Sequence, residues 1–205
     1  LEFRRVLFRS RFEFGTEENV GVAAGAIKYR EDVAFAKNMP NLEFVVAQTG
    51  SLCHEDHQAG TFEIDTVREL VAVANENGVK LKEHNADYLS PLQIQLRRAT
   101  GVHAMNIAPQ LGVVQTKLLK ELCLARIGET YWAPFAELVL NSGRWKKWTD
   151  SDLDEQKVIV AGHYCFNTPE YRAILEALSQ HANWDEEIQS ALWYVFDNYT
   201  TNLQF

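Results

Sequence analysis

Residues 79–91 read V-K-L-K-E-H-N-A-D-Y-L-S-P, and this stretch indicates the fold more clearly than any other. Its first four residues alternate apolar and polar side chains, as a half-buried β-strand does. A polar run at 83–88 follows, and Ser90 with Pro91 has the pattern of a helix N-cap and a proline in the first helical position. The stretch therefore predicts a strand, a polar loop and a helix that ends before Gly101, which together form one βα unit.

The same unit recurs along the chain, because three further short β-like runs each precede a helical pattern. These runs lie at residues 12–15, 44–47 and 102–107. Thr66 and Glu69 have the spacing of a capping box at the start of a helix that Gly78 ends. A longer helix is expected at residues 113–127. Four successive βα units imply a parallel sheet joined by right-handed crossovers.

The fold class that we expect is α/β, as half of a TIM-type (β/α)8 barrel. A complete barrel has eight such units and typically takes about 250 residues. An open doubly wound sheet is the alternative, but it is less favoured because no G-x-G-x-x-G motif follows any of the runs.

The first ten residues do not resemble a natural protein segment. Residues 1–10 read L-E-F-R-R-V-L-F-R-S, like the translation of a common sequencing-library adapter, and we exclude them as non-native. They lack the uninterrupted apolar core of a signal peptide. We therefore expect the N-terminal half of the barrel to be missing and residues 11–130 to form a partial barrel of four units.

Beyond residue 130 the pattern becomes mainly helical. We expect residues 131–205 to form a helical C-terminal extension of the same domain. Thr168 with Pro169 predicts the start of one helix, and the region of Asn183 begins another that runs towards Tyr199. Residues 158–161 form a further short apolar run. The tryptophans of the chain all lie in this part: Trp132, Trp145, Trp148, Trp184 and Trp193.

Composition excludes several classes of protein. The 205 residues are 46% hydrophobic and 23% charged, which is typical of a soluble globular chain, and no stretch has the roughly 18 consecutive apolar residues of a membrane span. A net charge of -8 argues against nucleic acid as a partner. Cys53, Cys123 and Cys165 form no C-x-x-C pair, which suits the cytoplasm. The P-loop, G-x-S-x-G and H-E-x-x-H motifs are absent from the sequence.

Functional side chains of a barrel lie on the loops that follow its strands. The densest polar cluster is K-E-H-N-A-D-Y at 82–88, which offers groups that hold sugar hydroxyls or move a proton beside a carbonyl. The alternative is that Asp87 and Ser90 merely cap the next helix. The candidates at predicted strand ends are Glu17, Gln48, Glu83, His84, Asn85, Asp87 and Tyr88.

A second cluster follows the strand at 44–47. It reads C-H-E-D-H at 53–57, and His54, Asp56 and His57 are candidate ligands of a divalent metal such as zinc. No helical H-x-x-H spacing fixes their geometry, so a solvated loop is the alternative.

Several motifs occur in an order that resembles the accessory, non-catalytic subunit of class II D-tagatose-bisphosphate aldolase, the GatZ/KbaZ-like family. They are F-G-T-E at 14–17, V-V-A-Q-T-G at 45–50, K-E-H-N-A-D-Y at 82–88, I-A-P at 107–109 and W-K-K-W at 145–148. The resemblance covers most of residues 12–175 and the C-terminal half of that family's barrel, while the loop at 51–60 departs from the family pattern. It implies a cytosolic protein of sugar catabolism that supports a separate catalytic subunit, which cleaves a ketohexose bisphosphate.

Two functions remain open at this point. The first is the accessory role, as a stabilising or activating partner of a zinc-dependent aldolase. The second is an enzyme in its own right, a metal-dependent epimerase or aldolase-like lyase acting on a ketose or ketose phosphate. The resemblance places Glu17, His84, Asp87 and Tyr88 at the barrel mouth. In an enzyme, the expected catalytic residues are Glu17, His84 and Asp87, and the expected sugar-binding residues are Gln48, Glu83, Asn85 and Tyr88.

Overall fold

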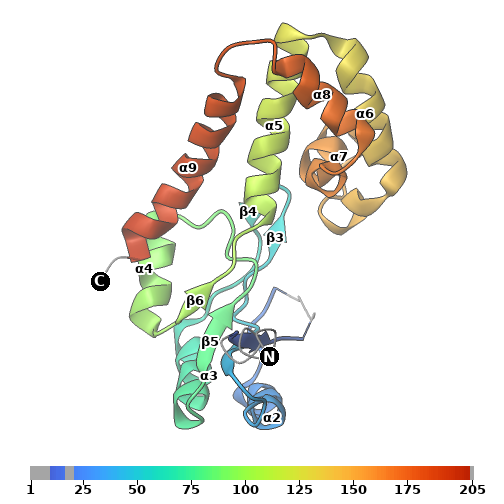
Figure 1. The fold of residues 1–205 in the computed structure, drawn as a ribbon. Helices are drawn as coiled ribbons and strands as arrows, with labels where there is room; N and C mark the ends of the chain where they lie inside the picture. Colours follow the sequence, from blue (N-terminus) through green and yellow to red (C-terminus); the bar gives the residue numbers. More distant parts are fainter. Residues whose placement is uncertain (1–9, 17–20, 204–205) are drawn as a thin grey trace, which may run out of the picture. The chain divides into compact units, whose positions relative to one another are not determined.

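The computed structural model describes residues 10–16 and 21–203, and the chain forms two compact units. The first unit comprises Leu1–Cys53 and Gln58–Ile107, and the second comprises His54–His57 and Ala108–Phe205 (Figure 1). The division after residue 107 assigns the long helix that follows the fourth strand to the second unit, whereas the sequence pattern groups this helix with the strand.

The first unit is built on a parallel four-stranded sheet, as the sequence predicts. Its strands follow chain order across the sheet as β1-β2-β5-β6, and each overlaps a run singled out in the sequence. Their bounds are β1 Phe12–Phe14, β2 Leu42–Ala47, β5 Lys80–Glu83 and β6 Ala104–Met105. The register sets Phe44 beside Lys80 and Val46 beside Lys82.

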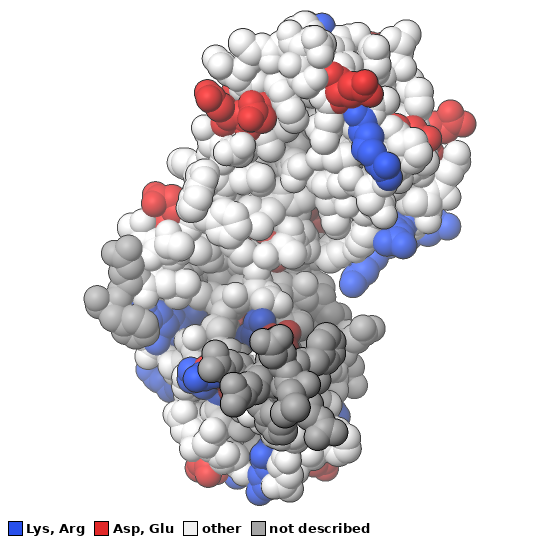
Figure 2. Space-filling model, in the orientation of Figure 1, with Lys and Arg blue, Asp and Glu red and all other residues white. Residues whose placement is uncertain are grey.

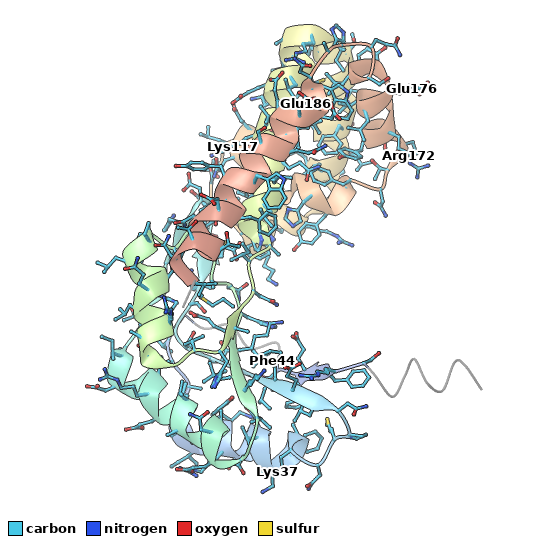
Figure 3. The ribbon with its side chains drawn as sticks, turned by 60° about the vertical axis from the view of Figure 1, so that its left-hand side comes forward. Lys37, Phe44, Lys117, Arg172, Glu176 and Glu186 are labelled. Atoms are coloured by element: carbon cyan, nitrogen blue, oxygen red, sulfur yellow. The ribbon has the colours of Figure 1, made fainter. Side chains whose placement is uncertain are left out.

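Three helices of the first unit cover one face of this sheet. α2 (Ala26–Ala36), α3 (Ile64–Glu76) and α4 (Pro91–Thr100) follow one another along one side of the strands (Figure 3). The side chains of Val45 and Leu81 point into this layer and are fully buried. A sheet whose strands follow chain order, with its helices on one face, is consistent with part of a barrel, whereas a doubly wound sheet carries helices on both faces.

The start of α4 confirms the predicted cap. The Ser90 hydroxyl accepts from the backbone N–H of Gln93, the Gln93 side chain accepts from the backbone N–H of Ser90, and Pro91 occupies the first helical position. The helix ends at Gly101, whose φ of 100° lies in the left-handed region that favours glycine.

The capping box predicted for α3 is wrong. The helix begins at Ile64, and its N-cap is Glu63. Thr66 lies inside the first turn, where its hydroxyl donates to the Glu63 carboxylate over 3.3 Å instead of accepting from the backbone. Asp65, also in the first turn, favours this earlier start because a carboxylate is stabilised at a helix N-terminus.

The second unit is helical. Its helices are α5 (Pro109–Arg126), α6 (Glu129–Ser142), α7 (Asp154–Ala161), α8 (Pro169–Leu178) and α9 (Trp184–Leu203), with 3-10 turns η1 (Arg144–Lys147) and η2 (Gly162–Cys165). Thr168 caps α8, as its sequence predicts, by accepting from the N–H of Tyr171. The expected helix at 113–127 starts earlier, because Pro109 occupies the first turn of α5. The apolar run at 158–161 is the end of α7.

Close contacts fix η2 against α5. A Cβ atom on Gly112 would lie 2.6 Å from the His163 ring, and one on Gly162 would lie 2.5 Å from the Thr116 side chain. The Thr116 hydroxyl is satisfied within α5, because it donates to the carbonyl of Gly112 over 2.7 Å. Glycine at both positions therefore lets the two backbones approach each other.

The surface carries charges of both signs. On the face drawn in Figure 2, acidic and basic side chains occur in small groups separated by uncharged surface. None of the helices formed by the described residues combines the length and the apolar character of a membrane span.

Candidate functional site

Charged side chains occupy the sheet face that lies opposite the helices of the first unit. Because side chains alternate along a strand, Lys82 of β5 projects to the other side from Leu81, which is buried against the helices. The Lys82 ammonium pairs with the Glu13 carboxylate of β1. Lys80 and Lys82 both lie over the ring of Phe44, at 5.5 and 6.0 Å from its centre. Phe44, which lies beside Lys80 on the neighbouring strand β2, therefore belongs to the same face (Figure 3).

His84, the first residue after β5, lies beside this ion pair. Its Nε2 atom lies 3.6 Å from Oε1 of Glu13. That nitrogen is buried and makes no hydrogen bond to any part of the chain that the structure describes. We call Glu13, Lys82 and His84 the strand-end cluster.

The strand-end cluster holds its groups in defined protonation states near neutral pH. The hydrogen bond from Lys82 is the main cause that keeps the pKa of Glu13 below its ordinary value, so the carboxylate is ionised. Burial is the main cause that lowers the pKa of His84, so the imidazole is neutral. A neutral imidazole can accept or donate a proton, and the adjacent ion pair offers one charged acceptor and one charged donor.

The loop after β5 has a special backbone. Asn85 and Tyr88 have φ values of 55° and 59°, in the left-handed region that non-glycine residues rarely adopt. Such conformations persist when the surrounding structure determines them, and they concentrate at binding and catalytic sites. The fixed shape of this loop sets the positions of the polar residues that it carries.

Gln58 ties this loop to the loop that follows β2. Its Nε2 donates to the backbone carbonyls of Asn85 and Asp87 over 2.8 and 2.9 Å, while its Oε1 accepts from the N–H of Leu52. The segment after β6 is joined to the same loop, because the backbone carbonyl of Asn106 accepts from the N–H of Ala86 over 3.0 Å. The loops at the carboxyl ends of three neighbouring strands are therefore joined by hydrogen bonds.

The structure separates Glu83 from the other predicted site residues. Its carboxylate points to the helix side, where it is fully buried and paired with Arg97 of α4. His84 and Asn85 are partly exposed on the loop, and Asp87 is fully buried.

The remaining candidates are placed as follows. Tyr88 is partly buried on the same loop as His84. Gln48 is partly buried at the end of β2, where its backbone carbonyl accepts from the N–H of Ala24 over 2.7 Å. Glu17 lies outside the described residues.

The metal-ligand candidates lie at the tip of the short hairpin formed by β3 (Cys53–His54) and β4 (His57–Gln58), a tip that belongs to the second unit. His54 Nε2 lies 3.8 Å from Asp150 Oδ2, and His57 Nδ1 lies 3.6 Å from Asp56 Oδ1. Within the described ranges, no three His, Cys, Asp or Glu side chains are grouped so that they could hold a metal ion. His54, Asp56 and His57 therefore form no such group with the other residues that the structure describes.

Sequence reasoning missed Glu13, Ser51 and Gln58 as parts of the site, and it included Lys82 in the cluster at 82–88 without giving it a role. The alternation K-L-K-E at 80–83 already places Lys82 on the opposite face from Leu81. Its pairing with Glu13 spans 69 residues and depends on the register of three strands, which no local pattern reveals. Ser51 contributes through its hydroxyl, which donates to the carbonyl of His84.

No protein-family model and no curated protein sequence matches the chain. Among solved structures, it is similar to a probable tagatose 6 phosphate kinase from Sinorhizobium meliloti 1021, with 15% identity and a TM-score of 0.68 over 94% of this chain and 62% of that one. It is also similar to the fructuronate-tagaturonate epimerase UxaE from Cohnella laeviribosi, with 11% identity and a TM-score of 0.64 over 98% of this chain and 49% of that one. At these identities the likeness is one of fold, and this chain spans about half to three-fifths of the neighbours' lengths.

Proposed function

We propose that this chain is part of a barrel protein of sugar metabolism that binds a ketose or ketose phosphate at the carboxyl ends of its parallel strands. Within that class, we propose the role of accessory subunit of a class II D-tagatose-bisphosphate aldolase, of the GatZ/KbaZ-like type. The observation that carries the proposal is the strand-end cluster, Glu13, Lys82 and His84, on the sheet face opposite the helices.

The chemistry of this cluster suits a polyhydroxylated ligand. The interior of a (β/α)8 barrel is normally filled by branched apolar side chains, and its active site opens at the carboxyl ends of the strands. Charged groups at this position are expensive to desolvate, so their presence favours a ligand that they contact. An acceptor, a donor and a neutral imidazole side by side match the alternating donors and acceptors of sugar hydroxyls.

The fold likeness supports the same class of function. Both neighbours have names that refer to a keto sugar or its acid, a tagatose 6-phosphate in one and fructuronate and tagaturonate in the other. The parallel strands in chain order support a part of a barrel, and we propose that this part is the C-terminal half. The proposed role is a cytoplasmic one, which the three free and buried cysteines support.

The accessory role is tested by reconstitution. The protein that contains this chain is mixed with the catalytic subunit of a class II tagatose-bisphosphate aldolase, and the half-life and turnover of the aldolase are measured with and without it. We expect a longer half-life or a higher turnover at stoichiometric mixing. No change in either quantity, with no complex detected by analytical ultracentrifugation, contradicts the accessory role.

An enzyme in its own right is the second candidate, and the protonation states at the strand ends favour it. A neutral His84 beside an ionised Glu13 can accept a proton from a sugar hydroxyl or from a carbon next to a carbonyl. Asp87, buried in the same loop, is a second acid–base candidate. Because the described residues form no group that could hold a metal ion, we derive no step that uses one.

Assays for epimerisation and cleavage of ketohexoses and their phosphates test this second candidate. The variants His84→Ala and Asp87→Asn are compared with the parent protein and with Glu17→Ala. Glu43→Gln, which breaks two ion pairs at the opposite ends of the strands, is the control. A loss of about a hundredfold in turnover for His84→Ala is expected of an acid–base residue. Unchanged turnover in every variant contradicts the hypothesis that these residues are catalytic.

A further inference from the structure

The charges of the strand-end cluster balance one another. Glu13 carries one negative charge and Lys82 one positive charge, and the two groups are paired. The Lys82 side chain is only 15% exposed, so its charge is held close to that of Glu13 rather than offered freely to solvent. His84, half-buried beside them, adds no charge when neutral.

We propose that this cluster recognises an uncharged hydroxyl group of the sugar and that any phosphate of the ligand is bound elsewhere. The inference rests on the proposed function and specifies the part of the ligand that these three residues contact. The hydroxyl proton is donated to Glu13 or to His84 Nε2, and the hydroxyl oxygen accepts from Lys82.

The positions of the atoms favour an uncharged group over an anion. A phosphate near Lys82 would also lie near the Glu13 carboxylate, and two negative charges this close to each other repel. A hydroxyl meets no such repulsion, because it can satisfy the donor and the acceptor at once. The buried and unbonded Nε2 of His84 offers it a third contact.

A second charged cluster at the other ends of the strands provides an internal comparison. There Glu43 accepts from both Arg11 and Lys80, each over 2.8 Å. Two cations share one carboxylate, so this cluster has an excess positive charge. The balanced charges of Glu13 and Lys82 are therefore not shared by every charged group on this sheet. Glu43→Gln is a matched control, because it also removes a carboxylate that is paired with lysine on the same sheet.

The test measures binding of a ketohexose and of its bisphosphate by titration calorimetry, with the protein that contains this chain. The variants are Glu13→Gln, Lys82→Met and the control Glu43→Gln. Circular dichroism and melting curves establish that each variant is folded. We expect Glu13→Gln and Lys82→Met each to weaken both ligands by about tenfold, which is the loss of one hydrogen bond to a charged group. The control leaves both affinities unchanged.

The ratio of the two affinities distinguishes the alternatives. If Lys82 binds a phosphate, Lys82→Met weakens the bisphosphate far more than the sugar, and Glu13→Gln strengthens the bisphosphate by exposing the lysine charge. Either result overturns the inference and leaves the proposed sugar binding in place. If the parent protein binds neither ligand, the proposed function fails and the inference fails with it. Equal losses of affinity for the sugar and for the bisphosphate support the inference.

Discussion

Nε of Arg97 lies 2.9 Å from each carboxylate oxygen of Glu83, and solvent reaches 3% of the arginine side chain and none of the glutamate. The pair joins the end of β5 to α4. The Arg97 guanidinium also lies 4.2 Å from the centre of the Phe62 ring, which precedes α3. The Arg97 side chain of α4 therefore contacts both β5, the strand that leads into the candidate site, and the segment that precedes α3.

Breaking this buried pair should destabilise the first unit strongly. Arg97→Met leaves the Glu83 carboxylate buried without its partner, and we expect the free energy of unfolding to fall by about 3–5 kcal/mol. The double variant Glu83→Leu with Arg97→Met removes both charges and should recover most of the loss. Urea denaturation of the protein that contains this chain measures both. A loss below about 1 kcal/mol for Arg97→Met would show that the pair is not buried as described.

Removing the side-chain bridge of Gln58 should loosen the loop that carries His84. Gln58→Leu leaves one N–H and two carbonyls without this partner, and we expect a loss of about 1–3 kcal/mol. Gln58→Glu keeps an oxygen that accepts from the N–H of Leu52, but it loses both hydrogen bonds that the amide donates. This variant therefore separates the accepted hydrogen bond from the two donated ones. Hydrogen exchange measures the result: the Leu52 amide should exchange faster in Gln58→Leu than in Gln58→Glu. Equal protection in both variants contradicts the bridging role.

The close approach of Gly50 and Gly60 should not tolerate a side chain. A Cβ atom on Gly60 would lie 1.8 Å from the carbonyl oxygen of Gly50, so Gly60→Ala must displace backbone in the loop after β2. Gly25→Ala is the matched control, because a Cβ there meets nothing within 4 Å. We expect Gly60→Ala to lower the melting temperature by several degrees, as a loss of about 1–3 kcal/mol would, and to weaken sugar binding. A melting temperature equal to that of the control would contradict the described packing.

Stability should decrease as the pH falls below about 6.5. Burial lowers the pKa values of His84, His103 and His163 in the folded protein, so the unfolded chain binds protons first as the solution is acidified. These residues contribute fully to the free energy of unfolding when the pH is above their pKa values in the unfolded chain. The contribution is lost as the pH falls towards their lower pKa values in the folded protein. Denaturation curves at pH 7.5 and 5.5 measure the effect. His163→Asn should reduce the difference between the two curves, whereas the exposed His181→Gln serves as the control. A stability that rises towards pH 5.5 contradicts this account.

Much of the fold of the first unit could be predicted because its signals are local. The alternation at 79–82 and the cap at Ser90 and Pro91 each act within a few residues, and the structure contains both. The start of α3 was mispredicted because Thr66 and Glu69 have the spacing of a capping box, while the hydroxyl of Thr66 bonds to Glu63. Spacing identifies which residues can cap a helix, but it does not decide which partner the side chain takes.

The site was harder to predict because its contacts are distant in sequence. A polar loop at 83–88 could be found from composition, but the side on which each residue points depends on the strand before it. Glu83 is the last residue of β5 and faces the helices, whereas Lys82 faces the other way and meets Glu13. Only the register of β1, β2 and β5 brings that pair together.

The most direct test of sugar binding at the strand ends is a crystal structure of the protein that contains this chain, determined with a bound ketohexose. We expect the ligand at the carboxyl ends of β1, β2 and β5, with one of its hydroxyl groups within hydrogen-bond distance of both Glu13 and Lys82. A sugar bound away from these residues, with the Glu13–Lys82 pair and His84 untouched, would contradict the account.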